Sequence, residues 1–186
     1  MKKIVLLFGF LVGLLLSGNM LLAVSLCYNN PDMEMSETLG YLGLIIIFSL
    51  ILVAIKVFRD KYNHHVLTIW QGFKVGAYIS LIASTMYVVV WLVDYYVFAP
   101  DFIDKYTEHV LLSAERDGAT TAEIAAQTTE MAEYKQMYQN PAFVIMATYA
   151  EVLPFGLVFS FIGAIVFRRK GRLVNEGPTH NNLLEH

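Results

Sequence analysis

Residues 141–167 read PAFVIMATYAEVLPFGLVFSFIGAIVF, and Glu151 is the only Asp, Glu, Lys or Arg among them. A helix needs about 20 apolar residues to cross a hydrocarbon core of about 30 Å, so this segment can span a membrane. Because lipid offers no hydrogen-bond partners, a spanning segment must satisfy its own backbone groups, which favours an α-helix. Three more segments share this pattern, residues 4–27, 39–58 and 75–98, and a capping box at Thr68–Gln71 extends the last one back to residue 69.

The whole chain has the composition of a membrane protein. It is 186 residues long and 56% hydrophobic, whereas soluble domains contain about 45–50% apolar residues. We therefore predict an all-α, polytopic membrane protein in which residues 1–170 form a single domain of four transmembrane helices. No stretch outside the spans is long enough for an ordinary soluble domain. Residues 171–186 contain Gly, Pro, Asn and Thr and are expected to be a disordered cytoplasmic tail.

The N-terminal segment has two alternative interpretations. Met1, Lys2 and Lys3 could open a secretory signal peptide, but the apolar stretch continues to Cys27 without a clear small-x-small cleavage site. A lipoprotein signal would need a small residue where Leu26 stands. We therefore expect this segment to be kept as the first transmembrane helix. Cys27 is the only cysteine, which excludes an intrachain disulfide and a cysteine-based metal cluster.

The distribution of Lys and Arg predicts the orientation in the membrane. Ten of the thirteen lie in the N-terminus, in residues 56–74 or in residues 168–172, whereas residues 99–140 contain only three. Because cytoplasmic segments carry the excess of Lys and Arg, both termini are expected in the cytoplasm and residues 99–140 in the periplasm. Trp70 and Trp91 lie near span ends, as aromatic residues at the membrane–water interface do.

Residues 99–140 are predicted to form a helical hairpin between the third and fourth spans. Residues 101–115 are amphipathic, Asp117-Gly118 signals a turn, and a capping box at Thr120–Glu123 starts a second helix that reaches about Tyr138. The expected packing residues of the hairpin are Ile103, Tyr106, Val110, Ile124 and Met131. The segment carries eight Asp and Glu against three Lys and Arg. We interpret these charges as a solvated surface, with a docking surface for a periplasmic partner as the functional alternative.

Small residues recur at four-residue spacing in three of the spans. The candidate helix-packing residues are Gly9 and Gly13 in the first span, Gly72, Gly76 and Ser80 in the third, and Gly156 and Ser160 in the fourth. Each set lies on one helix face, where small side chains let another helix approach closely. These faces are expected to pack the helices of one monomer, and a homodimer seam is the alternative.

Glu151 is the candidate functional residue inside the membrane. It lies ten residues into the fourth span, about 15 Å along the helix, and an ionisable residue at that depth is costly and is a functional hypothesis by default. Helix lengths place polar residues of the other spans at a similar depth, namely Asn19, Ser49, Ser84 and Tyr87. We expect Glu151 to point into the bundle, level with Asn19, as a neutral acid. Its role is either interhelical hydrogen bonding or a proton or cation relay.

The sequence contains no P-loop, GxGxxG, HExxH or GxSxG pattern. His64 and His65 without a third ligand nearby make a weak metal signal. Asp94 lies near the outer end of the third span and is expected to be interfacial. We therefore expect no catalytic residues, no cofactor, no metal site and no nucleic-acid partner, and a lipid bilayer around the protein.

Several short motifs occur in an order that resembles a known family. ETLGY opens the second span and FRDKY closes it, QGFKVG begins the third span, an acidic AEIA segment leads to YKQMYQNP, and PFGL lies in the fourth span. This order resembles the small four-span bacterial membrane proteins grouped as domain of unknown function 4199, over about residues 3–170. The resemblance implies a bacterial inner-membrane protein, and it implies no particular catalytic or binding residue.

Two classes of function remain open. The first is a non-enzymatic interaction or scaffold component, with a second copy or another membrane protein as its partner. The second is a small transport or proton-relay component centred on Glu151, for which four short spans would require oligomerisation. An intramembrane hydrolase is disfavoured because no nucleophile paired with a base is visible.

Overall fold

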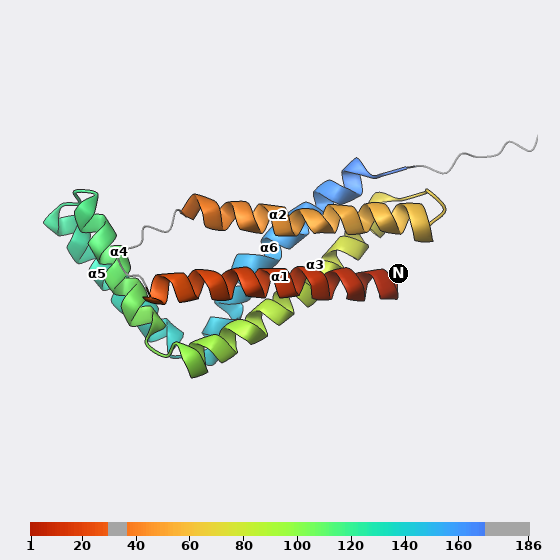
Figure 1. Cartoon of the computed structure of the whole chain (residues 1–186). Coiled ribbons are helices and arrows are strands. Elements are labelled where there is room, and N and C mark those ends of the chain that lie inside the picture. Colours follow the sequence, from red (N-terminus) through yellow and green to blue (C-terminus); the bar gives the residue numbers. More distant parts are fainter. Residues whose placement is uncertain (30–36, 170–186) are drawn as a thin grey trace, which may run out of the picture.

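A computed structural model describes residues 1–29 and 37–169. Within these residues the fold is helical and has no β-strand, which confirms the predicted all-α class. The helices are α1 (Lys2–Asn29), α2 (Glu37–Val57), α3 (Ile69–Val93), α4 (Phe102–Arg116), α5 (Thr121–Tyr138) and α6 (Pro141–Val166), with π-helical turns η1 (Phe58–Tyr62) and η2 (Asp94–Phe98) (Figure 1). The tail predicted for residues 171–186 lies outside the described residues, and its disorder stays a prediction.

Four of the helices are long and apolar enough to cross a membrane, as predicted. The spanning segments are Lys2–Leu26, Leu42–Tyr62, Ile69–Phe98 and Pro141–Val166. Large apolar side chains cover their outer surface, and Leu7, Leu22 and Met146 are each at least 66% exposed. A continuous apolar surface of this kind is typical of a protein that contacts a membrane.

Local side-chain signals set where three of the helices begin, and two of these signals are the predicted capping boxes. At α3, the Thr68 hydroxyl accepts a hydrogen bond from the backbone N–H of Gln71 at 3.2 Å, and the Gln71 side chain accepts one from the backbone N–H of Thr68. Thr120 and Glu123 make the same reciprocal pair at α5. The Asn140 side chain caps α6 by accepting a hydrogen bond from a backbone N–H two residues on. Each cap satisfies donors that have no partner within the first helical turn.

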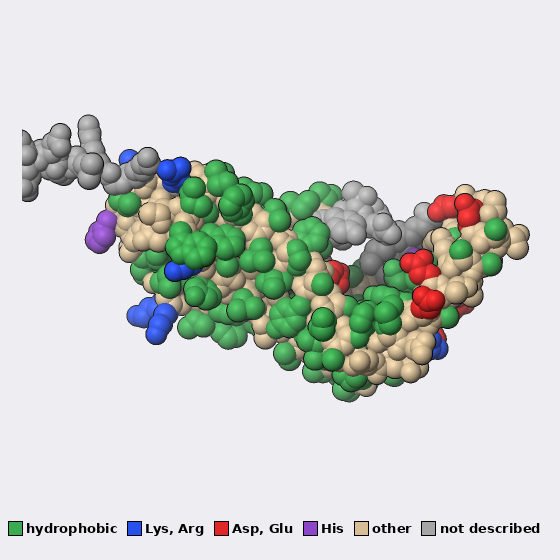
Figure 2. Space-filling model, turned by 180° about the vertical axis from the view of Figure 1, so that it is seen from behind, with side chains coloured by type: hydrophobic (Ala, Val, Ile, Leu, Met, Phe, Trp, Pro, Cys, Tyr) green, Lys and Arg blue, Asp and Glu red, His purple; other side chains and the backbone are tan. Residues whose placement is uncertain are grey.

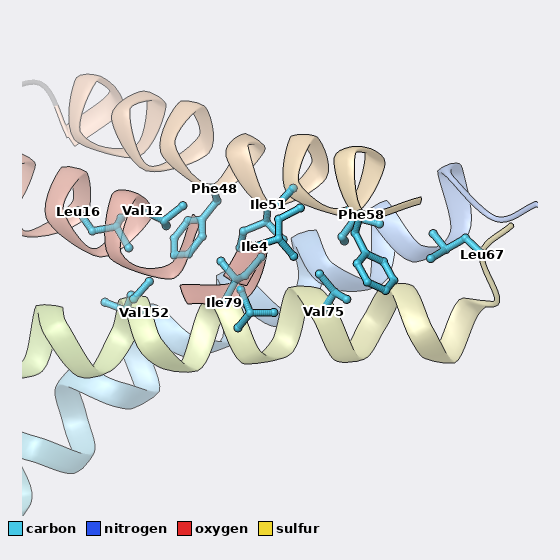
Figure 3. Close-up of a cluster of buried hydrophobic side chains, with 14 residues drawn as sticks. Ile4, Val12, Leu16, Phe48, Ile51, Phe58, Leu67, Val75, Ile79 and Val152 are labelled. Carbon is cyan, nitrogen blue, oxygen red and sulfur yellow. The ribbon is translucent and has the colours of Figure 1, made fainter. Parts of the chain in front are cut away.

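The bundle is built around α3, which packs along α1 and α6, while α2 lies against α1 and α6 (Figure 1). All four long helices contribute to the apolar core, which includes Val12, Leu16, Phe48, Ile51, Val75, Ile79 and Val152 (Figure 3). The start of α1, the α2–α3 connection and the end of α6 lie at one end of the bundle, here called the basic end. The other end carries the α4–α5 hairpin and is called the hairpin end.

Candidate functional site

The α4–α5 hairpin turns where the sequence indicates. Gly118 has a φ of +80°, a left-handed conformation that glycine adopts without the steric cost that other residues meet. Across the hairpin, the Lys135 ammonium forms an ion pair with Asp104. Ile103 is buried, whereas the expected packing residues Val110, Ile124 and Met131 are half-buried. The two helices therefore pack together but keep broad exposed faces.

Tyr106 does not belong to the hairpin's packed set, and this corrects the prediction. It is 45% exposed, and its ring stacks on Phe102 with the centroids 6.0 Å apart. Phe102, one helical turn earlier, contacts Trp91 of the bundle edge-to-face at 5.0 Å. Phe102 thus makes the contact with the bundle, and Tyr106 covers the outer side of Phe102.

An aromatic cluster joins the hairpin to the bundle, and we call it the aromatic joint. It lies where α3, η2, α4, α5 and α6 meet, and its rings contact one another: Trp91, Tyr95, Phe102, Tyr134, Tyr138 and Phe143. Tyr138 is at its centre and is only 8% exposed, with ring centroids 4.6 Å from Tyr134, 5.7 Å from Tyr95 and 5.8 Å from Phe143. Sequence reasoning placed Trp91 near a span end as an interfacial residue and missed this role of the cluster.

The Tyr138 hydroxyl stays protonated at neutral pH. Burial raises the pKa of the Tyr138 phenol. A hydrogen bond with the Tyr134 hydroxyl, 3.1 Å away, raises this pKa further. Ionisation would place a charge among packed rings, which is costly without a compensating partner. The aromatic joint is therefore an uncharged contact, and the charges of the hairpin lie on its outer surface.

Several acidic side chains lie on the visible face of the hairpin, and most of the visible basic side chains gather at the opposite end of the molecule (Figure 2). Glu108 on α4 and Glu130 and Glu133 on α5 are exposed and make no ion pair within the described residues. Glu123 is different, because its carboxylate caps α5. The hydrogen bond from the Thr120 backbone N–H lowers the pKa of this carboxyl.

Glu151 is exposed on α6, and this corrects the expectation that it points into the bundle. The buried positions of α6 repeat every four residues from Val144 to Ala164, with Gly163 in addition, and Val152 is one of them at 3% exposure. Glu151 is one residue earlier, about 100° around the helix. One turn later on its own face, Phe155 stacks on Phe48 of α2 with ring centroids 6.4 Å apart. Among the described residues, no hydrogen bond or ion pair to Glu151 is found.

Of the other residues of the proposed polar cluster, Tyr87 lies near Glu151, and Asn19, Ser49 and Ser84 have separate environments. Tyr87 is half-buried and lies close enough to Glu151 to interact with it electrostatically. The Asn19 side chain faces α2, because a Cβ atom placed on Gly43 would lie 3.0 Å from Asn19 Oδ1. The Ser49 hydroxyl donates a hydrogen bond to the Ile46 carbonyl of its own helix at 2.6 Å. Ser84 is fully buried, and its Oγ has no partner among the described residues.

The candidate helix-packing residues of α3 and α6 face one another in a reciprocal seam. A Cβ atom on Gly76 would lie 2.5 Å from Ser160 Oγ, and a Cβ atom on Gly156 would lie 2.5 Å from Ser80 Oγ. The two serine hydroxyl oxygens approach to 3.3 Å, and each serine also donates to the glycine carbonyl one turn earlier in its own helix. These glycine faces are thus occupied within one chain.

The remaining small residues pack in the same way. At Gly72, a Cβ atom would lie 3.0 Å from the backbone of Ala164 on α6. On α1, Cβ atoms at Gly9 and Gly13 would lie 2.9 Å from Ile82 and 2.8 Å from Met86 of α3. The small residues of α1 therefore receive large side chains of α3, and contacts with other proteins must use other surfaces.

The basic end is closed by contacts between the α2–α3 connection and the end of α6, which sequence reasoning missed. Leu67 and Arg169 exchange backbone hydrogen bonds, each 2.9 Å long. In η1, the Arg59 side chain pairs with Asp60 at 2.6 Å and lies over the Phe167 ring, 5.5 Å from its centroid. The FRDKY motif of residues 58–62 thus has a structural use in tying α2 to α6. The described residues contain no group of three or more His, Cys, Asp or Glu side chains that could hold a metal ion.

These features define a small multi-pass helical membrane protein with a hairpin of two helices inserted between its third and fourth spans. Over residues 7–169 the chain matches the model of the family described as "Protein of unknown function (DUF4199)", and it belongs to that family. The family resemblance suggested by the motif order is thus confirmed. No curated protein and no solved structure gives a significant match.

Proposed function

We propose that this protein is a non-enzymatic interaction or scaffold component of a membrane, and that its acidic hairpin contacts the partner. The observation that carries the proposal is how the hairpin is built. Its helices are fixed to the bundle by the aromatic joint, and carboxylates such as Glu108, Glu130 and Glu133 stand exposed without ion-pair partners in the described structure. A surface held in place loses little conformational freedom when it binds, which favours docking.

The chemistry of the hairpin selects the kind of partner. Its eight acidic residues outnumber its three basic ones, and Asp104 is already paired with Lys135. A partner with a basic surface would be attracted by the remaining carboxylates, and complementary charge mainly increases the rate and the specificity of association. The small-residue seams are filled within the chain, so they support no homodimer.

Neutralising the free carboxylates is expected to weaken capture of the partner. The test compares the full chain with a triple variant, Glu108→Gln, Glu130→Gln and Glu133→Gln, after affinity capture from native membranes at low salt. We expect the dominant co-purifying protein to fall about tenfold, and to fall similarly for the unchanged chain at high salt, because exposed charges are screened.

A matched variant with Thr129→Ala and Gln136→Ala changes two exposed uncharged side chains of α5 and is expected to retain the partner. Equal recovery of that protein with the triple variant and with the unchanged chain would reject the hairpin as the docking surface.

We further propose a bacterial inner-membrane location in which the basic end faces the cytoplasm and the hairpin faces the periplasm. Lys61, Lys74 and Arg168 are exposed at the basic end, and Lys and Arg accumulate on the cytoplasmic side of membrane proteins. Reporters inserted at Gly118 and fused to the C-terminus are expected to report opposite compartments. Reporters in the same compartment would contradict the arrangement of four spans.

One observation supports a proton or cation relay as a second candidate function. Tyr87 of α3 and Tyr138 of the aromatic joint lie close enough to Glu151 for its charge to affect them. Hydroxyl groups beside an intramembrane acid are suitable for passing protons between the hairpin end and the membrane interior. Such a relay would have to continue through a second chain or a partner, because the basic-end half of the bundle is filled by the apolar core around Ile51, Ile55 and Val75.

A further inference from the structure

Glu151 is an exposed acid on a membrane-spanning helix. It lies ten residues after Pro141, about 15 Å along α6 at about 1.5 Å per residue, within the spanning segment Pro141–Val166. Neither a hydrogen bond nor an ion pair to Glu151 is found among the described residues. Of the four spans, α6 is also the least buried inside the protein. An acid that is exposed on a membrane-spanning helix without a partner is unfavourable, so a group from outside the chain would stabilise it.

The chain itself offers no cation at this position. On the hairpin side, Lys135 pairs with Asp104 and Lys105 lies 3.7 Å from Asp101. Arg116 ends α4 beside the hairpin turn, away from the bundle. All other Lys and Arg residues lie at the N-terminus, in residues 56–74 or after residue 167. A counter-charge for ionised Glu151 would therefore come from another molecule.

The surface around Glu151 is shaped for a close neighbour. Ala147 lies four residues before Glu151, Ala150 directly before it and Pro154 three residues after it. Of these three, Ala150 and Pro154 are exposed. Small side chains on a membrane helix let a second helix approach its backbone. Larger exposed side chains stand on both sides along α6, namely Met146 at 71% exposure and Val158 at 56%. The carboxyl thus has small neighbours on this side of α6, whereas the larger Phe155 lies one turn later on its other side, against Phe48.

We propose that this face of α6, formed by Ala147, Ala150, Glu151 and Pro154, binds one transmembrane helix of a partner protein through a Lys or Arg on that helix. This proposal rests on the proposed function, and it adds that the partner contacts the protein inside the membrane through a transmembrane helix. A Lys or Arg at the depth of Glu151 would neutralise both charges inside the low-dielectric bilayer, where such a pair interacts more strongly than in water. A second copy of this chain is unsuitable, because its corresponding face offers another acid and no cation.

The proposal can be tested with defined transmembrane peptides and the full-length chain. The chain, labelled with a donor dye, is reconstituted into phosphatidylcholine vesicles with an acceptor-labelled Leu/Ala helix that carries a single Lys at the depth of Glu151. Association is measured by energy transfer. We expect it to be about tenfold tighter than for the same peptide with Leu in place of Lys, which corresponds to a strong polar contact between membrane helices.

Variants of the chain and of the peptide identify the contact. Glu151→Leu is expected to reduce binding of the Lys peptide to the level of the Leu peptide, and Glu151→Lys is expected to bind a peptide that carries Glu instead. A peptide with its Lys moved two turns along the helix is the matched control and is expected to bind no better than the Leu peptide. Because Glu151 is exposed, these variants should fold, which circular dichroism and size-exclusion chromatography verify.

Three outcomes would overturn the proposal. The Lys and Leu peptides could bind the unchanged chain equally well, or Glu151→Leu could retain the preference for Lys. The Lys peptide could also lose its advantage when phosphatidylethanolamine replaces part of the phosphatidylcholine, which would identify a lipid amine as the occupant of the site. None of these outcomes would reject the hairpin as a docking surface, because partner capture through Glu108, Glu130 and Glu133 does not involve Glu151 and is tested separately.

Discussion

Gly76→Leu is expected to prevent most of the chain from folding into a monodisperse protein. Even a Cβ atom at this position would lie 2.5 Å from Ser160 Oγ and 2.9 Å from the Ser160 Cα atom, so the backbone of α6 itself is in the way. Overpacking a well-packed core costs about 1–3 kcal/mol, and more where a backbone must move. The α3–α6 seam is also the most extensive contact between two helices of the bundle.

The measurement is the monodisperse fraction in mild detergent by size-exclusion chromatography, together with the midpoint of thermal unfolding. Gly18→Leu on α1 is the matched control, because no atom lies within 4 Å of a Cβ placed there. The control is expected to fold normally, since replacing glycine within a helix gains up to about 1 kcal/mol of helix propensity. Similar behaviour of the two variants would show that α3 and α6 do not pack as described.

Tyr138→Ala is expected to release the hairpin from the bundle while the four spans stay folded. Tyr138 is 8% exposed and contacts the rings of Tyr95, Tyr134 and Phe143. Truncating a buried aromatic side chain costs about 3–5 kcal/mol. The hairpin has no other large apolar contact with the bundle besides this joint and the neighbouring Ile103 within the described residues. We therefore expect the loss to fall on α4 and α5.

Hydrogen–deuterium exchange resolved by peptide is the suitable measurement. In Tyr138→Ala, the amides of α4 and α5 are expected to exchange at least tenfold faster, while those of α3 and α6 below the joint stay protected. Met137→Ala is the control, because that neighbouring side chain of α5 is 43% exposed and is not part of the joint. Unchanged protection of α4 and α5 in Tyr138→Ala would show that another contact holds the hairpin. The proposed docking role depends on this attachment, so the variant should also lower partner capture.

Much of the local structure followed from the sequence because it depends on neighbouring residues. The four spans follow from the length and hydrophobicity of each segment. The helix starts at Thr68, Thr120 and Asn140 follow from side chains that reach backbone groups two or three residues away. The turn at Gly118 follows from the one residue that takes a left-handed conformation easily. None of these features requires knowledge of a distant part of the chain.

The candidate site was harder to predict because it depends on how each helix is rotated about its axis. Depth along α6 could be counted from the sequence, and Glu151 lies within the span as expected. Gly156 and Ser160 marked a packing face of α6, but the apolar residues around the rest of the helix did not show whether Glu151 also faces the bundle. Packing against α3 selected the face with Val152, Gly156 and Ser160, and left Glu151 exposed.

The sequence by itself determined the helical class, the four spans, the hairpin and the separation of acidic and basic ends, because these properties reside in single segments. The tertiary structure alone decided which small residues meet, that Tyr138 holds the hairpin, and that Arg59 lies over Phe167 at the basic end. These contacts join residues far apart in the chain, and they form where side chains from different helices fit together at close range.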